Sequence, residues 1–600
     1  MPPPPPPLGR FGVEVTARTL VRASDPPPGF PAVLPVSNLD LILGSFNVSL
    51  IVVYPAPARG FAAVAAAVRA ALPAFLSRFF PFAGRVVADA ATGIPEVACD
   101  NAGAELVLAD AGVALADVDF ADADRSLGTI QLPYEQGIAL SLQLVRFKCG
   151  GFSMSWGTNH LLVDGHGLTA LPTAWAEMLR TGGLSWEPHH DRRSLFRPRS
   201  PPRHGASLDA EFTRYAPGSL VNPLLAAALV RRNYVVGADD LDRLRAAAST
   251  ASRRATRLEA LSAHVWKLLA AATHGSDARC RLAWLVDGRR RLDPAKYDPT
   301  LVSSYLGNVV TYASRESPVE AITSSPLADV AAMAGAAIGE VFRQERYEEL
   351  VDWMELRKAA AFKNGEKWTE TVGIGTGSPA VVVSAFVPFR VDGDFGFGSP
   401  ALVMPWVRPG RLGSAAMTVA RSPREDGSWV VSARLWPRLA DAIEADPDAV
   451  LKPATAARLG LARRAPAAAD VARHASRFFI WFLRLPRDKR AYRRGAVTLA
   501  AALDLESLKK VNFFETTGRE VEEVKGAEYS EGGGEGVGEV VVSQGQCGGG
   551  CGRWCWGMGS SSTVFDMVSA VLAVEIMGTP YLHGMVIRLV IGDSLYLWNM

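Results

Sequence analysis

The sequence has almost no net charge. Its 600 residues carry 63 Lys and Arg against 61 Asp and Glu, which gives a formal net charge of +2 at pH 7. Proteins that hold nucleic acid through a global positive field have a large basic excess. The near balance therefore argues against a nucleic-acid partner, while the length allows several domains or one large two-domain enzyme.

Cysteines and long hydrophobic runs are also scarce. Only six cysteines occur, and the three in the first three quarters of the chain are scattered, which predicts free thiols: Cys99, Cys149 and Cys280. No stretch offers the roughly 18 uncharged apolar residues of a membrane span. The start, MPPPPPPLGRFGVEV, lacks the apolar core of a signal peptide. We therefore expect a cytoplasmic protein without a membrane partner.

Strand-like and helix-like patterns alternate along most of the chain, which predicts an α/β fold. Apolar residues at helical spacing predict a helix over 62–76, and strict alternation predicts strands around 140–144 and 152–156. Residues 187–222 are rich in Pro, Arg, His and Ser, which is typical of an exposed crossover between two domains.

This crossover loop separates an expected N-terminal domain, 1–186, from an expected C-terminal domain, 223–453. After residue 453 the composition shifts to Ala/Arg-rich and then Gly-rich segments, so we expect 454–600 to be a low-complexity tail with little fold of its own. Three cysteines stand four apart in this tail, but zinc sites usually show two ligand pairs. Low complexity is the favoured interpretation of Cys547, Cys551 and Cys555.

The stretch Thr158 to Leu168, TNHLLVDGHGL, places His160 at the end of a strand pattern and Asp164 just beyond it. Gly165 and Gly167 predict a turn before the next helix, so His160 and Asp164 should lie on opposite sides of a tight loop rather than on one helix face. From spacing alone, three interpretations stay open. His160 is a buried structural histidine, a metal ligand together with Asp164 and His166, or a general base.

Other segments carry a resemblance to the BAHD acyltransferases, the plant acyl-CoA-dependent family. Its HxxxDG motif is matched by His160, Asp164 and Gly165, and its DFGWG motif by Asp394 to Gly398 with Phe397 in place of Trp. The resemblance covers roughly residues 10–453 and none of the tail. Lesser matches follow in family order: Ser37 to Asp40, Phe80 to Arg85, Ala263 to Trp266, Asp287 to Arg291 and Leu306 to Asn308.

The resemblance implies two similar-sized chloramphenicol-acetyltransferase-like α/β domains, with mixed sheets flanked by helices and a channel between the domains. It implies that His160 is the general base in that channel and that no covalent acyl-enzyme forms. It also implies that Asp164 pairs with an arginine, for which Arg289 is the first candidate and Arg291 the second. A structural role is implied for the glycine of the first motif and for the second motif: Gly165, Asp394, Gly396 and Gly398.

Two further sets of residues follow from the resemblance. The family holds the CoA phosphates with basic and hydroxyl residues ahead of a helix, which assigns this role to Arg253, Arg254 and Thr256. The same residues are equally typical of a basic helix start that is exposed to solvent. Many members carry a Ser/Thr-Trp pair whose indole N–H helps the oxyanion. Here the segment around Ser384 ends in Phe386, which has no side-chain donor, so Ser384 or a backbone N–H is expected to replace it.

The sequence thus predicts acyl-CoA-dependent transfer of an acyl group, with hydroxycinnamoyl preferred, to an alcohol or amine. The expected enzyme is a monomer that uses no metal and no cofactor beyond acyl-CoA as co-substrate. Two alternatives stay open. One is a catalytically impaired relative that binds CoA esters or partner proteins, and the other is a metal hydrolase built on His160, Asp164 and His166.

Overall fold

The computed structural model describes residues 11–215, 229–273, 278–374, 378–389, 391, 395–407 and 415–462, and five strands near the C-terminus. The chain divides into two compact units, Met1–Arg463 and Arg464–Met600. The strands of the second unit form one antiparallel sheet in chain order: β19 (Val511–Phe514), β20 (Arg553–Met558), β21 (Ala570–Thr579), β22 (Leu582–Ile591) and β23 (Ser594–Asn599). Cys555 lies in β20, whereas Cys547 and Cys551 lie outside the described residues.

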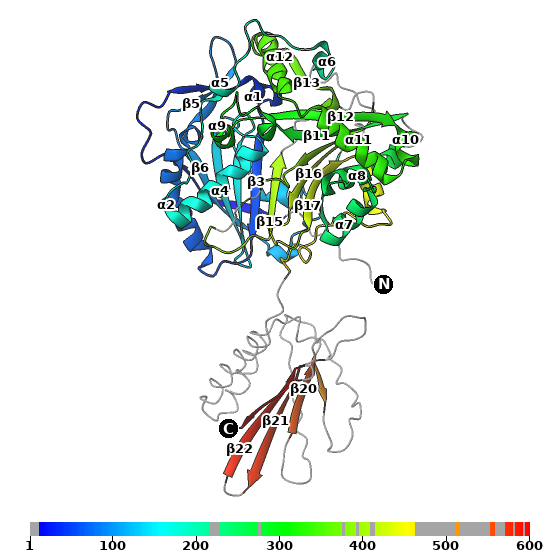
Figure 1. The fold of residues 1–600 in the computed structure, drawn as a ribbon. Helices are drawn as coiled ribbons and strands as arrows, with labels where there is room; N and C mark the ends of the chain where they lie inside the picture. Colours follow the sequence, from blue (N-terminus) through cyan, green and yellow to red (C-terminus); the bar gives the residue numbers. More distant parts are fainter. Residues whose placement is uncertain are drawn as a thin grey trace, which may run out of the picture. The chain divides into compact units, whose positions relative to one another are not determined.

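The first unit contains a six-stranded sheet in the order β1-β6-β7-β8-β3-β15, with helices α2 (Gly60–Arg78) and α4 (Gly165–Thr181) over one face (Figure 1). Alternate residues of β3 enter different cores. Leu50 and Val52 pack with α2 and α4, whereas Ile51 and Val53 pack on the opposite face. The strands are β1 (Val13–Val21), β3 (Asn47–Tyr54), β6 (Ala104–Ala111), β7 (Leu140–Phe147), β8 (Phe152–Asn159) and β15 (Leu402–Val407).

The expected local elements of this half are present: α2 contains 62–76, and β7 and β8 contain the two alternating segments. By length and composition, α2 would also suit a membrane span. Its larger apolar side chains, however, are buried in the same core as Trp156 and Trp175, which is the pattern of a core helix.

A second, seven-stranded sheet has the order β12-β11-β14-β16-β17-β10-β18, and α8, α11 and α14 pack on one of its faces (Figure 1). Its opposite face lines the cavity described below. The strands are β10 (Val230–Val236), β11 (Arg279–Asp287), β12 (Val310–Pro318), β14 (Ala380–Ala385), β16 (Ala415–Arg421), β17 (Trp429–Leu435) and β18 (Lys452–Pro453). The helices on the first face and beside it are α7 (Ala238–Ala247), α8 (Arg257–Thr273), α10 (Val319–Ser324), α11 (Leu327–Glu340) and α14 (Pro437–Glu444).

Smaller elements complete the first unit. Strands β2 (Val33–Pro35), β5 (Pro95–Ala98) and β4 (Arg85–Ala88) form a three-stranded sheet, and β13 (Lys367–Glu370) pairs with β9 (Phe212–Tyr215). The remaining helices are α1 (Asn38–Leu43), α3 (Leu127–Ile130), α5 (Arg192–Leu195), α6 (Ala206–Asp209), α9 (Pro299–Ser304), α12 (Gln344–Lys363) and α13 (Thr371–Ile374).

Three features bear on the expected domain boundaries. Strand β15 comes from the C-terminal half but pairs with β3 in the N-terminal sheet. The segment 187–222, expected to be exposed, includes the buried side chain of Arg192. The residues just after 453 belong to the first unit, where Ala454, Leu459 and Leu461 pack in its core.

Candidate active site

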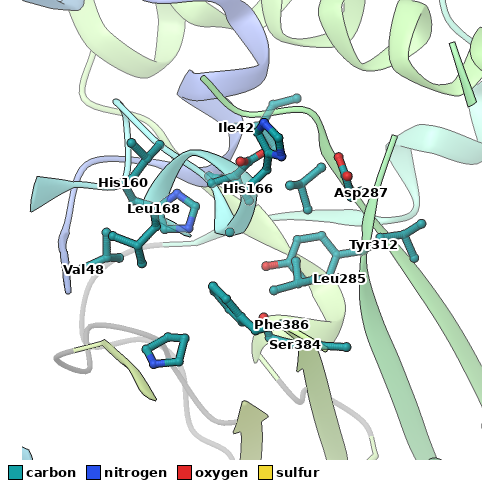
Figure 2. A pocket seen from close by; sticks show the side chains of 18 of the residues that line it. Ile42, Val48, His160, His166, Leu168, Leu285, Asp287, Tyr312, Ser384 and Phe386 are labelled. Atoms are coloured by element: carbon teal, nitrogen blue, oxygen red, sulfur yellow. The ribbon is translucent and has the colours of Figure 1, made fainter. Parts of the chain in front are cut away.

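A cavity of about 1760 Å³ lies between the two sheets of the first unit. His160 and Leu168 line it from the N-terminal half, while Ser384, Phe386 and Thr418 line it from the C-terminal half. Figure 2 shows His160 on the wall beside Val48 and Leu168, with Ser384 and Phe386 below and Tyr312 across from it. A polar side chain in a large, mostly apolar cavity between two halves is the usual arrangement of a small-molecule site.

His160 directly follows strand β8 and is half-buried. Its backbone N–H donates to the Phe46 carbonyl at 2.8 Å, and its carbonyl accepts from Asn308 Nδ2 at 2.9 Å. Its ring lies against the Phe46 ring, with 4.7 Å between the two centroids. The imidazole therefore stands on a backbone that is held at both its donor and its acceptor.

The expected pair between Asp164 and Arg289 is present and buried. Arg289 donates from Nη1 to Asp164 Oδ2 at 2.6 Å and from Nη2 to Oδ1 at 3.2 Å. Asp164 also accepts from the backbone N–H of Gly167 at 3.1 Å and of Val309 at 3.0 Å, and it caps helix α4. Four donors occupy the two carboxylate oxygens, so Asp164 holds the loop and has little capacity left to relay a proton.

The charges around this pair set the protonation states of its neighbours. Burial alone would raise the pKa of Asp164, but the Arg289 positive charge and hydrogen bonds hold it below the ordinary value of 3.8. Burial and the Arg289 charge together lower the pKa of His166 below 6.5. His166 is therefore neutral at pH 7, and its Nε2 donates to the Ser303 carbonyl at 2.9 Å.

A second buried clamp, which the sequence did not assign, holds the other end of the loop. Asp40 Oδ1 accepts from the backbone N–H and from Nδ2 of Asn308, both at 2.8 Å. Arg192 contacts Asp40 Oδ2 at 3.3 Å and donates to the carbonyls of Leu161 and Leu162 at 3.1 and 2.7 Å. The segments Ser37 to Asp40 and Leu306 to Asn308, noted only for their family order, thus meet beneath His160.

A turn does precede the helix, at residues 160–162, but the two motif glycines do not form it. They lie in the first turn of α4, and Asp164 is the N-cap. A Cβ on Gly167 would come within 2.2 Å of the Leu306 carbonyl oxygen. A Cβ on Gly165 would meet ring atoms of Phe389 and Phe386 at 3.0 and 3.2 Å. Both glycines therefore serve close packing against the C-terminal half rather than a reversal of the chain.

Ser384 and Phe386 both line the cavity. The backbone N–H of Phe386 already donates to the Val419 carbonyl at 2.7 Å, so it is engaged in the sheet. Ser384 on β14 is the register partner of Thr418 on β16, so the two hydroxyls sit side by side on the cavity face. Thr418 could not be identified from the sequence, because strand pairing, and not spacing along the chain, places it next to Ser384.

Of the DFGFG motif, Asp394 lies outside the described residues. Phe395 is buried in the N-terminal core beside Tyr54, with ring centroids 5.9 Å apart. Gly396 and Gly398 have φ values of +78° and +103°, a region that favours glycine. None of Phe395, Gly396 or Gly398 lines the cavity, which fits a structural motif.

The residues expected to hold CoA phosphates do not line the cavity. Arg253 donates to Glu259 at 2.7 Å, Thr256 lies in the exposed turn ahead of α8, and Arg254 is exposed on the same segment. The basic residues that do line the cavity were not predicted for this role. They include Arg290, Arg291 and Arg357, and Arg291 stacks over the Phe342 ring at 3.9 Å.

The arrangement does not support the metal-hydrolase alternative. Both Asp164 oxygens face Arg289, and the His166 Nε2 faces a backbone carbonyl rather than an open position. Among the residues that the structure describes, no group of three His, Cys, Asp or Glu could hold a metal ion.

Comparison with known proteins identifies the family. The model of the Transferase family matches residues 11–449. Putrescine hydroxycinnamoyltransferase 1 of Oryza sativa subsp. japonica is 30% identical over 66% of this chain and 89% of its own length. Anthranilate N-benzoyltransferase protein 1 of Dianthus caryophyllus is 28% identical over 68% of this chain and 96% of its own length.

Solved structures show the same fold. F. sporotrichioides TRI101, complexed with Coenzyme A and T-2, superposes with a TM-score of 0.56 at 18% identity, over 70% of this chain and 99% of that one. The chloramphenicol-acetyltransferase-like architecture expected from the sequence is thereby confirmed. The motif loop and the cavity agree with these relatives. The chain belongs to the Transferase family of BAHD acyltransferases and is hydroxycinnamoyltransferase-like.

Proposed function

We propose that this acyltransferase moves an acyl group from acyl-CoA to a hydroxyl or amine, with His160 as the general base. The observation that carries the proposal is the position of the imidazole. It stands on the wall of a cavity that both halves line, on a loop held by two buried ionic clamps. A neutral imidazole, with an ordinary pKa near 6.5, accepts a proton readily at cytoplasmic pH.

In the proposed reaction, a ring nitrogen of His160 takes the proton from the acceptor O–H or N–H. The acceptor atom then bonds to the thioester carbon, and the resulting tetrahedral intermediate breaks its C–S bond. The CoA thiolate leaves and takes up the proton that the imidazolium returns, which gives the free CoA thiol and a neutral His160. No oxidant, metal or covalent enzyme intermediate is needed, and bringing both substrates to one base supplies much of the rate.

The oxyanion of that intermediate needs a donor, and Phe386 has none. We assign this role to the hydroxyls of Ser384 and Thr418, which sit in register on the cavity face. This pair replaces the indole that many members of the family carry. The proposal therefore favours an active enzyme over an impaired relative that only binds CoA esters.

A hydroxycinnamoyl donor is the preferred acyl group. Phe46, Phe386, Phe389 and Trp406 line the cavity and offer flat apolar surfaces to a planar aromatic acyl chain. The names of two relatives point to hydroxycinnamoyl and benzoyl groups. For the CoA phosphates we now favour Arg290, Arg291 and Arg357, since these line the cavity. We further propose a cytoplasmic monomer that uses acyl-CoA as a co-substrate and no cofactor.

The decisive experiment uses the purified full chain with hydroxycinnamoyl, benzoyl, acetyl and malonyl thioesters against mixed alcohols and amines. A His160→Ala variant should lose about 10²–10⁴-fold in kcat, the usual contribution of a general base. His166→Ala is the matched control from the adjoining first turn of α4 and should retain most of the turnover. If no acceptor is acylated, the proposal fails. Loss of activity with strong chelators, or an equal loss in both variants, would instead favour the metal hydrolase.

A further inference from the structure

The ring of Phe46 lies against the imidazole of His160. Their centroids are 4.7 Å apart, and the planes of the two rings are inclined by 33°. Other histidines in the part of the chain that the structure describes meet an aromatic ring at a greater distance and a steeper angle, with centroids 5.8 to 6.4 Å apart and planes inclined by 49° to 73°: His190 on Phe30, His166 on Phe389 and His189 on Tyr305. The closer and flatter contact places the face of the Phe46 ring, which carries the negative end of its quadrupole, over the imidazole.

The backbone holds the two rings in this contact. The N–H of His160 donates to the carbonyl of Phe46 at 2.8 Å. Ser45, the residue before Phe46, is held in turn. Gln136 Nε2 donates to its carbonyl at 2.8 Å and to its hydroxyl at 2.9 Å, and Asn159 Nδ2 donates to the same hydroxyl at 2.9 Å. Because the chain is fixed on both sides of the contact, the Phe46 ring keeps its place beside the proposed base.

The two buried carboxylates that hold the His160 loop are already occupied. In a Ser-His-Asp triad, a carboxylate stabilises the imidazolium that forms on the base. Here Asp164 faces Arg289 and accepts from two backbone N–H groups. Asp40 faces Arg192 and also accepts from two backbone N–H groups. Both carboxylates therefore have little capacity left to stabilise an imidazolium, and the ring of Phe46 offers a contact of a different kind.

We propose that the face of Phe46 stabilises the imidazolium that forms when His160 takes the proton of the acceptor, which makes Phe46 a positioning residue for the base. The inference rests on the proposed role of His160 and adds to it. A cation within about 6 Å of a ring centroid is attracted by the negative face of the ring. A general base is neutral before the proton transfer and positive in the transition state, so the attraction is stronger in the transition state. An interaction of this kind raises kcat and leaves KM nearly unchanged.

Two other effects of the same ring differ from this attraction. Burial disfavours a charge, but His160 is half-buried and lines the cavity, so the imidazolium keeps part of its solvation. Phe46 also lines the cavity and offers its surface to the donor. Contact with the donor is present in the ground state and in the transition state alike, so it changes KM rather than kcat. The two kinetic constants therefore separate the two roles of Phe46.

The test keeps the shape of the ring and changes its charge distribution. Mono-, di- and trifluorinated phenylalanines in place of Phe46 withdraw electron density from the ring face step by step. Along this series kcat should fall by about 2- to 10-fold in total, the range of a cation–π attraction at a partly solvated site, with the KM of both substrates unchanged. Phe46→Leu should lose a similar factor, and Phe46→Tyr, which restores a ring, should recover most of it. The matched control is the same series at Phe30, which contacts His190 and does not line the cavity.

A kcat that stays constant along the Phe46 series, while His160→Ala is inactive, would overturn the inference and leave acyl transfer by His160 intact. A change confined to the KM for the thioester would also overturn it, and would assign Phe46 to the donor alone. Equal losses in the Phe30 series would attribute the effect to folding and count against the inference as well, and thermal unfolding of each variant measures that contribution. Absence of acyl transfer by wild type would remove both proposals.

Discussion

The side-chain amide of Asn308 donates to the carbonyl of His160 at 2.9 Å, and its partner on the other side is the fully buried Asp40. Residues from both halves of the first unit therefore fix the backbone of the proposed base. A displacement of about 1 Å at a catalytic group can cost on the order of 10²-fold in rate. The position of the imidazole thus depends on residues that never touch a substrate.

Replacing Asn308 should lower kcat with little change in KM. Asn308→Ala removes the hydrogen bond to the His160 carbonyl and leaves Asp40 short of a donor, so the loop can shift. We expect a loss of about 10²-fold in kcat, measured by steady-state kinetics. Asn233→Ala is the control, since Asn233 is buried and bonds a carbonyl in the same way, at Phe120. Equal losses in both variants would point to general destabilisation.

Removing the charge of Asp164 should destabilise the fold. Asp164→Asn leaves Arg289 buried without its carboxylate, which costs on the order of 3–5 kcal/mol in the free energy of unfolding. Urea denaturation at pH 7 measures it. Asp242→Asn is the control because its bond to Arg257 is largely solvent-exposed, and it should cost less than about 1 kcal/mol.

The same variant should change the acid dependence of stability. The pKa of Asp164 is lower in the folded chain than its ordinary value of 3.8. Between these two values the unfolded chain binds more protons, so the stabilisation is complete above 3.8 and is lost as the pH falls through the folded pKa. Wild type should lose this contribution on acidification, and Asp164→Asn should have none to lose. Parallel acid dependence in both proteins would contradict the assignment.

The hydroxyl pair can be tested by removing both donors. The double variant Ser384→Ala, Thr418→Val should lose about 10²–10³-fold in kcat, which is typical of a lost oxyanion donor. Each single variant should lose less, because the other hydroxyl remains. Ser155→Ala removes a buried hydroxyl in the N-terminal sheet, away from the cavity lining, and should retain kcat. Full activity in the double variant would show that this hydroxyl pair is not the oxyanion donor.

Gly167 should tolerate no side chain. In Gly167→Ala the new methyl group would lie 2.2 Å from the Leu306 carbonyl oxygen, a backbone atom that cannot rotate away. We expect a loss of about 1–3 kcal/mol in the free energy of unfolding. Gly339 lies in helix α11 with open space at its Cβ position, so Gly339→Ala should instead stabilise by about 0.5–1 kcal/mol. Thermal unfolding of the two variants should therefore shift in opposite directions.

The local helices and strands and the loop of His160 could be predicted from the sequence, because both depend on patterns among residues close together in the chain. Alternation in β7 and β8 and the spacing from His160 to Asp164 lie within a few residues. The choice of Arg289 as the partner of Asp164 came from the family resemblance, and the structure shows that bond.

The features that the sequence missed all depend on strand pairing or on long-range packing. Phe46 reaches His160 because β3 pairs with β8, and no local pattern fixes that register. Arg192 sits in a Pro-rich, basic stretch that resembles a solvated linker, yet its guanidinium is buried against Asp40. The turn expected at Gly167 was wrong because a glycine signals a tight contact as well as a reversal.

The placement of β15 has a consequence for how this chain can be divided and how it folds. The N-terminal sheet is complete only when a strand translated some 350 residues after β3 has docked on it. A fragment that ended in the crossover would leave the apolar edge of β3 open to pair with other chains and aggregate. The same long loop closure should make folding slow and place both halves in a single cooperative unfolding transition.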